Sequence, residues 1–370
     1  MRFPTLAATA ALALATTLPA VAADKLDTIL ANAMAGSKVP AAGVLVMRNS
    51  QVEDQVVTGL RRNDGKDAVT LDDAWVIGST GKVMTVAMVI RLVEHGTLSW
   101  ETPLEQMLPE LARSMRPEYR KVTLLQLLSH RAGLPRDLRN TRAIDSYFTD
   151  KRELGVQRVA YSAAALKEKP EAKPGTAFSY SNTGFIIAAA IAEKVSGKTY
   201  DELMQAEVYG PLGMQTAGSG TTGDGQVRGH SKGKPKLVMK KESDGVPAMY
   251  APAGFLHMSL ADWAKFSLDQ LAGAKGEGKL LAAADYKLMQ TAQPGSGAGL
   301  DWGVQPSIAG RKGPVLVHQG SDGNWLAVIV LFPEQGTGVL AVANAAEDMG
   351  ADKVINGMIG PLFSRLAPAK

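Results

Sequence analysis

The chain has 370 residues, a formal net charge of +4 at pH 7 and no cysteine. The missing cysteines exclude disulfides, a thiol nucleophile and cysteine-ligated zinc. The length allows a sizeable core, in one large domain or in two intertwined ones.

The first 23 residues have the composition of a secretory signal peptide. Arg2 supplies a positive charge, Leu6–Leu18 an apolar segment, and either Ala20-Val21-Ala22 or Val21-Ala22-Ala23 a cleavage site of small residues. The apolar segment is too short to cross a bilayer. We therefore expect residues 1–23 to be removed, no membrane span, and a periplasmic or secreted protein.

The next segments predict a helix, a hairpin and a second, longer helix. Lys25–Met34 carries apolar residues along one helical stripe. The apolar run Ala42–Met47 indicates a buried strand, and Arg48–Ser50 turns the chain into a second strand near Gln55–Leu60. A long helix then runs from about Ser79 to Gly96. It is apolar almost all the way round, so we expect it to be central and buried.

The middle of the chain is predicted to be mainly helical. Val122–Leu128 indicates a short apolar helix, and Gly184–Val195 a longer buried one. Ser219–Ala248 is rich in glycine, lysine and proline, and is interpreted as surface loop with irregular strand. Its lysine-rich part, Lys232–Lys241, is interpreted as a solvated loop, so no nucleic-acid partner is expected.

Sheet signals return near the C-terminus. Three closely spaced strands are predicted at Val315–Gln319, Trp325–Phe332 and Gly338–Ala343, and such short connections demand antiparallel neighbours. A final helix over Lys353–Leu366 is expected to be interrupted by Pro361. These elements predict an α/β (α+β) fold in which helices flank an antiparallel sheet. We expect residues 24–76 and 249–370 to form the sheet domain and 77–248 a mainly helical insertion.

Ser79 and Lys82 are the first candidate catalytic pair. They are three residues apart at the start of a helix, so their side chains project from one face as neighbours. Burial and the positive end of the helix dipole favour a neutral lysine amine, which can take a proton from the serine. The Ser79 amide is placed to stabilise an oxyanion. A serine cap followed by a lysine is the alternative interpretation.

Tyr180 and Asn182 are the second candidate pair, in a loop just before the apolar helix. A phenol can relay a proton between the lysine, the serine and a leaving group, and an amide two residues on can hold the substrate. A buried tyrosine that simply satisfies a loop is the alternative.

His318, Gly320 and Ser321 form the third motif, at the end of a predicted strand. Gly320 lets a substrate backbone approach the strand edge, and the Ser321 N–H can supply a second oxyanion donor. A surface histidine at a strand end is the alternative. His130, at a helix end, is interpreted as a cap or loop brace rather than a catalytic group.

Together the three motifs resemble the serine β-lactamase and penicillin-recognising D-alanyl-D-alanine peptidase superfamily. The fit is to the branch that shares Tyr-x-Asn with class C β-lactamases, DD-peptidases and their esterase relatives. Val122–Pro135, Pro174–Gly184 and Pro211–Met214 also resemble family segments, and the resemblance spans about residues 30 to 345. It implies a β-lactamase/transpeptidase-like fold.

The resemblance implies a role for each motif residue. Ser79 would be the acylating nucleophile, Lys82 its base, and Tyr180 the proton relay and deacylation partner. Asn182 and His318 would bind substrate. The amides of Ser79 and Ser321 would form the oxyanion hole.

The sequence departs from the β-lactamases proper at one motif position. At His318 they usually carry the lysine of Lys-Thr-Gly, and an unperturbed histidine is mostly uncharged at neutral pH. We therefore expect a serine hydrolase of ester, amide or β-lactam bonds with esterase-like activity favoured. A true β-lactamase or a D-alanyl-D-alanine carboxypeptidase is the alternative.

A non-catalytic penicillin-binding sensor is the alternative from another class. It would usually have lost Lys82 or Tyr180, and both are present. No Gly-x-Ser-x-Gly elbow or His-Glu-x-x-His zinc motif occurs in the sequence. We expect a small-molecule substrate, no metal, no cofactor and a monomer.

Overall fold

A six-stranded antiparallel sheet forms the centre of the computed structural model, which describes residues 24–223, 225–236, 239–241 and 244–366. The predicted signal peptide lies outside the described residues. In sheet order the strands are β2 (Gln51–Gly59), β1 (Ala41–Arg48), β11 (Thr337–Ala343), β10 (Leu326–Phe332), β9 (Arg311–Gly320) and β8 (Gly303–Ile308). The three predicted C-terminal strands are thus confirmed as antiparallel neighbours.

Strand β1, from near the N-terminus, pairs with β11 from near the C-terminus, and Val44 lies opposite Ala341. Both ends of the chain therefore build one sheet. The hairpin from β1 to β2 turns through Asn49 and Ser50, which have φ values of 51° and 57°. Two such residues in succession suit the tight turn that matches the twist of paired strands.

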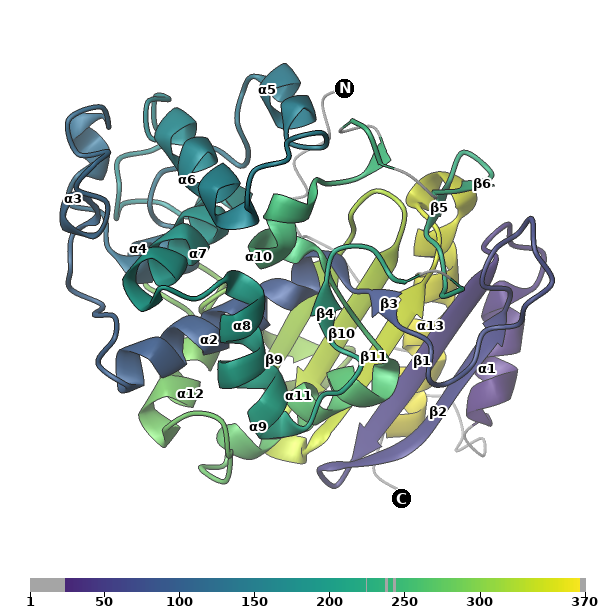
Figure 1. Cartoon of the computed structure of the whole chain (residues 1–370). Coiled ribbons are helices and arrows are strands. Elements are labelled where there is room, and N and C mark those ends of the chain that lie inside the picture. Colours follow the sequence, from purple (N-terminus) through teal and green to yellow (C-terminus); the bar gives the residue numbers. More distant parts are fainter. Residues whose placement is uncertain (1–23, 224, 237–238, 242–243, 367–370) are drawn as a thin grey trace.

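Helices cover both faces of the sheet (Figure 1). On one face, α1 (Leu26–Met34) and α13 (Ala351–Leu366) pack together over Val44 and Val46 of β1. On the other, α2 (Lys82–Glu94) and α11 (Leu260–Gly273) belong to a core that includes Leu45 and Met47. Alternate residues of β1 thus enter different cores, as the pleat of a strand requires.

The expected interruption of the last helix at Pro361 is wrong, because α13 runs unbroken through it. Proline removes one backbone hydrogen bond and strains the preceding turn. Met358 before it and Leu362 after it are both fully buried in the same core. Burial of this apolar face outweighs the local cost of the proline.

The remaining helices are α3 (Leu104–Met107), α4 (Leu124–Leu128), α5 (Thr141–Ser146), α6 (Leu154–Ala165), α7 (Asn182–Ser196), α8 (Tyr200–Met204), α9 (Gly210–Leu212), α10 (Ala251–Gly254) and α12 (Ala283–Gln290). Most of them lie at the left of Figure 1, whereas α9 and α10 lie nearer its centre. Short strands form two small sheets, namely β3 (Trp75–Val76), β7 (Leu256–Met258) and β4 (Gly218–Ser219), and β5 (His230–Ser231) with β6 (Lys234–Pro235). The division into a sheet domain and a helical insertion remains a prediction.

Helix α2 is the central buried helix that the sequence predicts. Ten of its 13 residues are buried. The helix begins at Lys82, directly after a 3-10 turn at Gly78–Gly81, so Ser79 lies in that turn rather than in the α-helix itself. The turn continues directly into α2, which fixes Ser79 and Lys82 on one rigid support.

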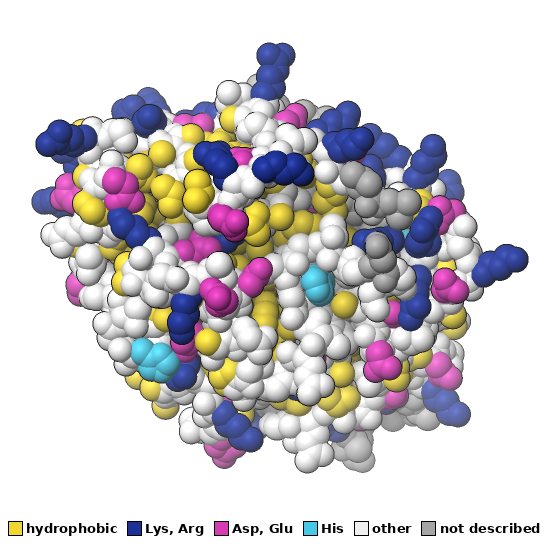
Figure 2. Space-filling model, viewed as in Figure 1, with side chains coloured by type: hydrophobic (Ala, Val, Ile, Leu, Met, Phe, Trp, Pro, Cys, Tyr) yellow, Lys and Arg dark blue, Asp and Glu magenta, His cyan; other side chains and the backbone are white. Residues whose placement is uncertain are grey.

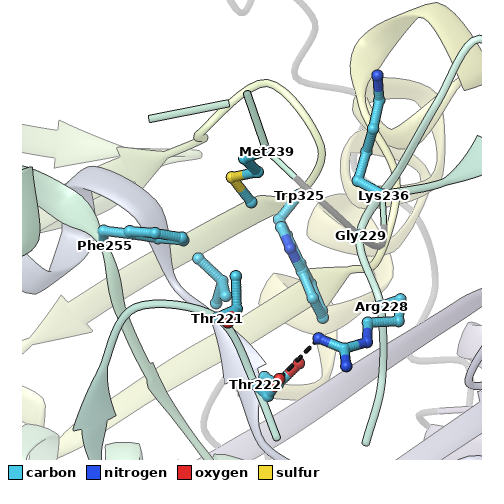
Figure 3. Close-up of a pocket in the computed structure, with 9 residues that line it drawn as sticks. Thr221, Thr222, Arg228, Gly229, Lys236, Met239, Phe255 and Trp325 are labelled. Carbon is cyan, nitrogen blue, oxygen red and sulfur yellow. Dashed lines mark hydrogen bonds between the residues drawn. The ribbon is translucent and has the colours of Figure 1, made fainter. Parts of the chain in front are cut away.

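The segment predicted as surface loop at Ser219–Ala248 is partly buried. His230 is fully buried, and its amide donates to the Asn324 carbonyl oxygen at 3.0 Å. A small cavity lies between this segment and Trp325, which directly precedes β10, and Met239 and Phe255 also line it (Figure 3). The lysine-rich part projects outward at the upper right of Figure 2, where basic side chains gather. The segment thus braces the turn that follows β9.

Candidate active site

Ser79 and Lys82 face each other as the sequence predicts. The Lys82 Nζ atom lies 2.9 Å from the Ser79 Oγ atom, and it also donates to the Ala253 carbonyl oxygen. Lys82 is fully buried, whereas Ser79 is partly exposed. A buried amine thus contacts a hydroxyl that a substrate can reach.

The surroundings of Lys82 make its amine easier to deprotonate. Burial is the largest influence and, together with a smaller effect of the Arg136 guanidinium, it lowers the pKa of Lys82 to about 8. The carboxylates of Asp301 and Asp137 oppose this shift. An amine with such a pKa is partly unprotonated near neutral pH and can serve as a base.

Tyr180 completes the cluster around the serine. Its ring lies 5.1 Å from the Lys82 Nζ atom and stacks on the His130 ring at a centroid distance of 4.5 Å. Desolvation raises the Tyr180 pKa well above its usual value and the Asp301 charge raises it further, although a hydrogen bond with Ser79 lowers it. The phenol therefore keeps its proton at neutral pH and is a donor there.

Asn182 is the first residue of α7, and a neighbouring acid fixes its orientation. Its Nδ2 atom donates to both carboxylate oxygens of Asp137, at 3.0 and 3.2 Å. Its Oδ1 atom is buried, and no partner for it is found among the described residues. An acceptor left open in this way is suited to a substrate N–H group.

Gly78 and Gly320 allow the turn that carries Ser79 and the end of β9 to approach closely, with the two predicted oxyanion amides at this contact. A Cβ atom on Gly320 would lie 2.6 Å from the Ser79 nitrogen, and one on Gly78 would lie 2.4 Å from the Ser321 nitrogen. Gly78 also has a φ of 54°, which glycine adopts without strain. Any side chain at either position would push β9 away from the turn that carries Ser79.

His318 does not point freely into solvent but joins a buried network. Its Nε2 atom lies 2.8 Å from Asp301 Oδ2, and its Nδ1 atom 2.9 Å from the Gln319 carbonyl oxygen. The other oxygen of Asp301, Oδ1, lies 2.8 Å from His130 Nε2. His130 Nδ1 accepts a hydrogen bond from the Ser181 amide at 3.0 Å. His130 thus braces the loop that carries Tyr180, as the sequence predicts.

Three charged residues near the site were missed by the sequence analysis. Asp137 orients Asn182, and Asp301 orients His130 and His318. The Arg136 guanidinium lies 5.4 Å from the centroid of the Tyr180 ring, and the arginine side chain is 65% exposed. Asp301 has a φ of 66°, which is uncommon outside glycine. Only its place between two buried apolar residues, Leu300 and Trp302, could have pointed to it.

The part of the chain that the structure describes contains no group of three or more His, Cys, Asp or Glu side chains that could hold a metal ion. Within the same residues, no helix is both long and apolar enough to cross a membrane. A reaction without metal or cofactor remains a prediction.

Comparison with known proteins places the chain in a family. The family model described as Beta-lactamase matches residues 26–357, so the chain belongs to the β-lactamase family of serine hydrolases. Penicillin-binding protein 4 of Amycolatopsis lactamdurans is 27% identical over 316 residues, which cover 82% of this chain and 80% of that protein. The D-alanyl-D-alanine-carboxypeptidase/endopeptidase AmpH of Escherichia coli (strain K12) is 26% identical over 281 residues, covering 74% and 71%.

A solved structure confirms the fold. The octameric penicillin-binding protein homologue from Pyrococcus abyssi matches with a TM-score of 0.71 and 25% identity, over 90% of this chain and 76% of that one. The predicted mixed fold, an antiparallel sheet with flanking helices, is therefore correct. The predicted monomer stays a prediction, and the octamer is a property of that homologue.

Proposed function

We propose that this protein is a secreted serine hydrolase that forms an acyl-enzyme on Ser79 Oγ. The observation that carries the proposal is the 2.9 Å separation between Lys82 Nζ and Ser79 Oγ, together with the lowered pKa of that lysine. A buried base beside a partly exposed hydroxyl is the arrangement that activates a weak nucleophile.

In the first half of the reaction, neutral Lys82 takes the Ser79 proton as Oγ attacks the substrate carbonyl carbon. The negative oxygen that forms lies against the Ser79 and Ser321 amides. Tyr180 gives its phenolic proton to the leaving amine or alcohol and regains one from Lys82. The carbonyl–leaving-group bond breaks, and the acyl group remains on Ser79.

In the second half, water replaces the leaving group. It loses a proton through Tyr180 and Lys82, attacks the acyl carbon and releases the carboxylic acid, while Ser79 Oγ regains its proton. The same residues act in reverse order, so the enzyme returns to its starting state.

The contacts of Asn182 and His318 indicate which class of substrate the site would bind. The open Asn182 Oδ1 suits a substrate amide N–H. His318 is not a free surface histidine, because both of its ring nitrogens face acceptors, and only a ring with a proton on each nitrogen donates to both. We therefore propose substrates with a carboxylate near the scissile bond, namely D-alanyl peptides or β-lactams. Activated neutral esters are second, since they need only Ser79, Lys82 and the two amides.

The decisive experiment is intact-mass detection of acyl adducts with a panel of β-lactams, D-alanyl peptides and short-chain esters, alongside product release. Ser79→Ala is the matched control. An adduct that forms and turns over supports an enzyme. An adduct that persists without product would favour the non-catalytic penicillin-binding sensor, and no adduct with any probe would contradict the proposal.

Location and assembly are part of the same proposal. The intact mass of the protein recovered from the periplasm or medium tests whether residues 1–23 are removed on export. Light scattering tests whether the exported protein is a monomer. An unprocessed cytoplasmic protein, or a stable oligomer, would contradict them.

A further inference from the structure

The protonation of His130 follows from its hydrogen bonds. The Ser181 amide can only donate, so the His130 Nδ1 atom that receives it carries no proton. The proton of a neutral ring must then be on Nε2, where it donates to Asp301. Burial, the largest influence, lowers the pKa of His130 against the opposing effect of Asp301. His130 is therefore a neutral imidazole in one fixed tautomer.

His318 differs because neither of its nitrogens meets a donor. Nδ1 faces the Gln319 carbonyl oxygen, and Nε2 faces Asp301 Oδ2. A neutral imidazole has one donor nitrogen and can satisfy only one of these acceptors. Both contacts are hydrogen bonds only when both nitrogens carry protons, so the geometry is that of an imidazolium.

Asp301 is the group on which this arrangement depends. Burial raises its pKa, but the electrostatic interactions and hydrogen bonds with His318 and His130 outweigh burial and hold the pKa well below the usual range. Its side chain is 1% exposed, so its charge is little screened by water. The other charged groups that face this centre are Lys82, Arg136 and Asp137.

We propose that Asp301 is a positioning residue that keeps His318 positively charged and His130 neutral, and that it thereby selects substrates with a carboxylate beside the scissile bond. This inference rests on the proposed function. His318 then supplies the positive charge at the strand end that lysine usually supplies in related β-lactamases, but only while Asp301 is present. The same carboxylate holds the ring that stacks on Tyr180.

The size of the effect follows from the charge. A hydrogen bond to a charged group is stronger than one between neutral groups. Loss of the His318 charge should therefore lower selectivity for an anionic substrate over its neutral analogue by roughly tenfold. The readout is a ratio, so a general loss of activity does not imitate it.

The first test measures the ring directly and needs no substrate. In the full-length protein with ¹⁵N-labelled histidine, NMR shifts of the ring nitrogens separate imidazolium from neutral rings, and His318→Gln assigns the signals. At about pH 7.5 we expect His318 to be doubly protonated in the wild type and neutral in Asp301→Asn and Asp301→Gly. Asp137→Asn, which removes a nearby carboxylate that contacts neither histidine, is the matched control and should leave the signals unchanged.

Asp301→Gly is included because glycine adopts the positive φ at this position without strain, which guards against a variant that fails to fold. The wild-type measurement alone can overturn the proposal, because it would do so if His318 were neutral at about pH 7.5. Unchanged His318 signals in the folded Asp301 variants would also overturn it.

The second test compares a cephalosporin with its methyl ester, which differ only in the carboxylate. Both Asp301 variants should lower the ratio of the two kcat/KM values by roughly tenfold. In the His318→Lys variant, replacing Asp301 should alter the ratio by less than about threefold, because an ammonium keeps its charge without Asp301. An equal fall of the ratio with histidine and with lysine at position 318 would show that Asp301 has a merely structural role. Absence of any adduct on Ser79 would instead contradict the proposed function and leave the NMR result standing.

Discussion

Lys82 Nζ lies 2.9 Å from Ser79 Oγ, across one turn where a 3-10 segment becomes helix α2. Because one rigid element carries both atoms, their separation does not depend on loop motion. The hydroxyl is partly exposed while the amine is buried. The pair should therefore act as one unit, and losing either member should cost about as much as losing both.

Ser79→Ala should abolish the acyl-enzyme with every substrate while leaving the fold intact, because it removes one partly exposed hydroxyl. Intact mass after incubation with penicillins and esters checks the adduct, and thermal unfolding checks the fold. A variant that keeps most of its turnover would end the covalent mechanism.

The lysine pKa predicts the pH profile. A base must be unprotonated, so kcat/KM should be low in acid and rise with pH through the Lys82 pKa of about 8. Lys82→Ala should lose nearly all activity at every pH, and so should Lys82→Arg, whose guanidinium cannot give up its proton. Near-normal acylation by Lys82→Ala at neutral pH would make this residue structural.

Tyr180→Phe tests the proton relay. Because its pKa is raised, Tyr180 acts as a neutral donor, and its loss should slow departure of poor leaving groups more than of good ones. We expect amide substrates to lose roughly 100-fold or more in kcat, and activated esters much less. Equal losses for both classes would indicate that Tyr180 only positions Ser79.

The sequence predicted the parts of the site that are local along the chain. Ser79 with Lys82, Tyr180 with Asn182, and His318 with Ser321 are each set by one turn or loop, so their spacing could be recognised in the sequence, and the three motifs together carry the family resemblance. Short apolar runs with close spacing and the apolar α2 likewise predicted the sheet and its central helix.

What the sequence did not reveal depends on contacts between distant segments. Asp301 lies in a turn before β8, yet it bonds His130 after α4 and His318 on β9. No spacing rule links these three residues, so the sequence could not show that a buried carboxylate contacts His318. Pro361 was misjudged for the same reason, because the burial that keeps α13 intact is tertiary.

His318→Gln tests which cation binds the carboxylate. Without the imidazolium, kcat/KM for a cephalosporin should fall by roughly tenfold relative to its methyl ester. The exposed Arg136 is the alternative cation, and Arg136→Gln should change that ratio by less than about threefold, because its charge is screened by solvent. A larger effect of Arg136→Gln than of His318→Gln would assign the carboxylate to the arginine.

Asp322, next to Ser321, predicts how stability depends on pH. Burial, the largest influence, raises its pKa from 3.8 to about 6, although the amides of Asn324 and Trp325 donate to it and oppose the shift. Its other carboxylate oxygen is buried, with no partner among the described residues. Because the folded-state pKa is above the unfolded one, this group favours folding most below pH 3.8 and loses that contribution as pH rises through about 6.

Asp322→Asn resembles the protonated acid, since its amide oxygen can still accept from both backbone amides. The variant should therefore be more stable than the wild type above about pH 6, by up to about 2–3 kcal/mol, and the two should converge in acid. Denaturant unfolding at several pH values measures the difference, and Asp348→Asn, an exposed carboxylate beyond β11, is the control that should show no such trend. A constant difference between Asp322→Asn and wild type at all pH values would mean that Asp322 does not titrate in this range in the folded protein.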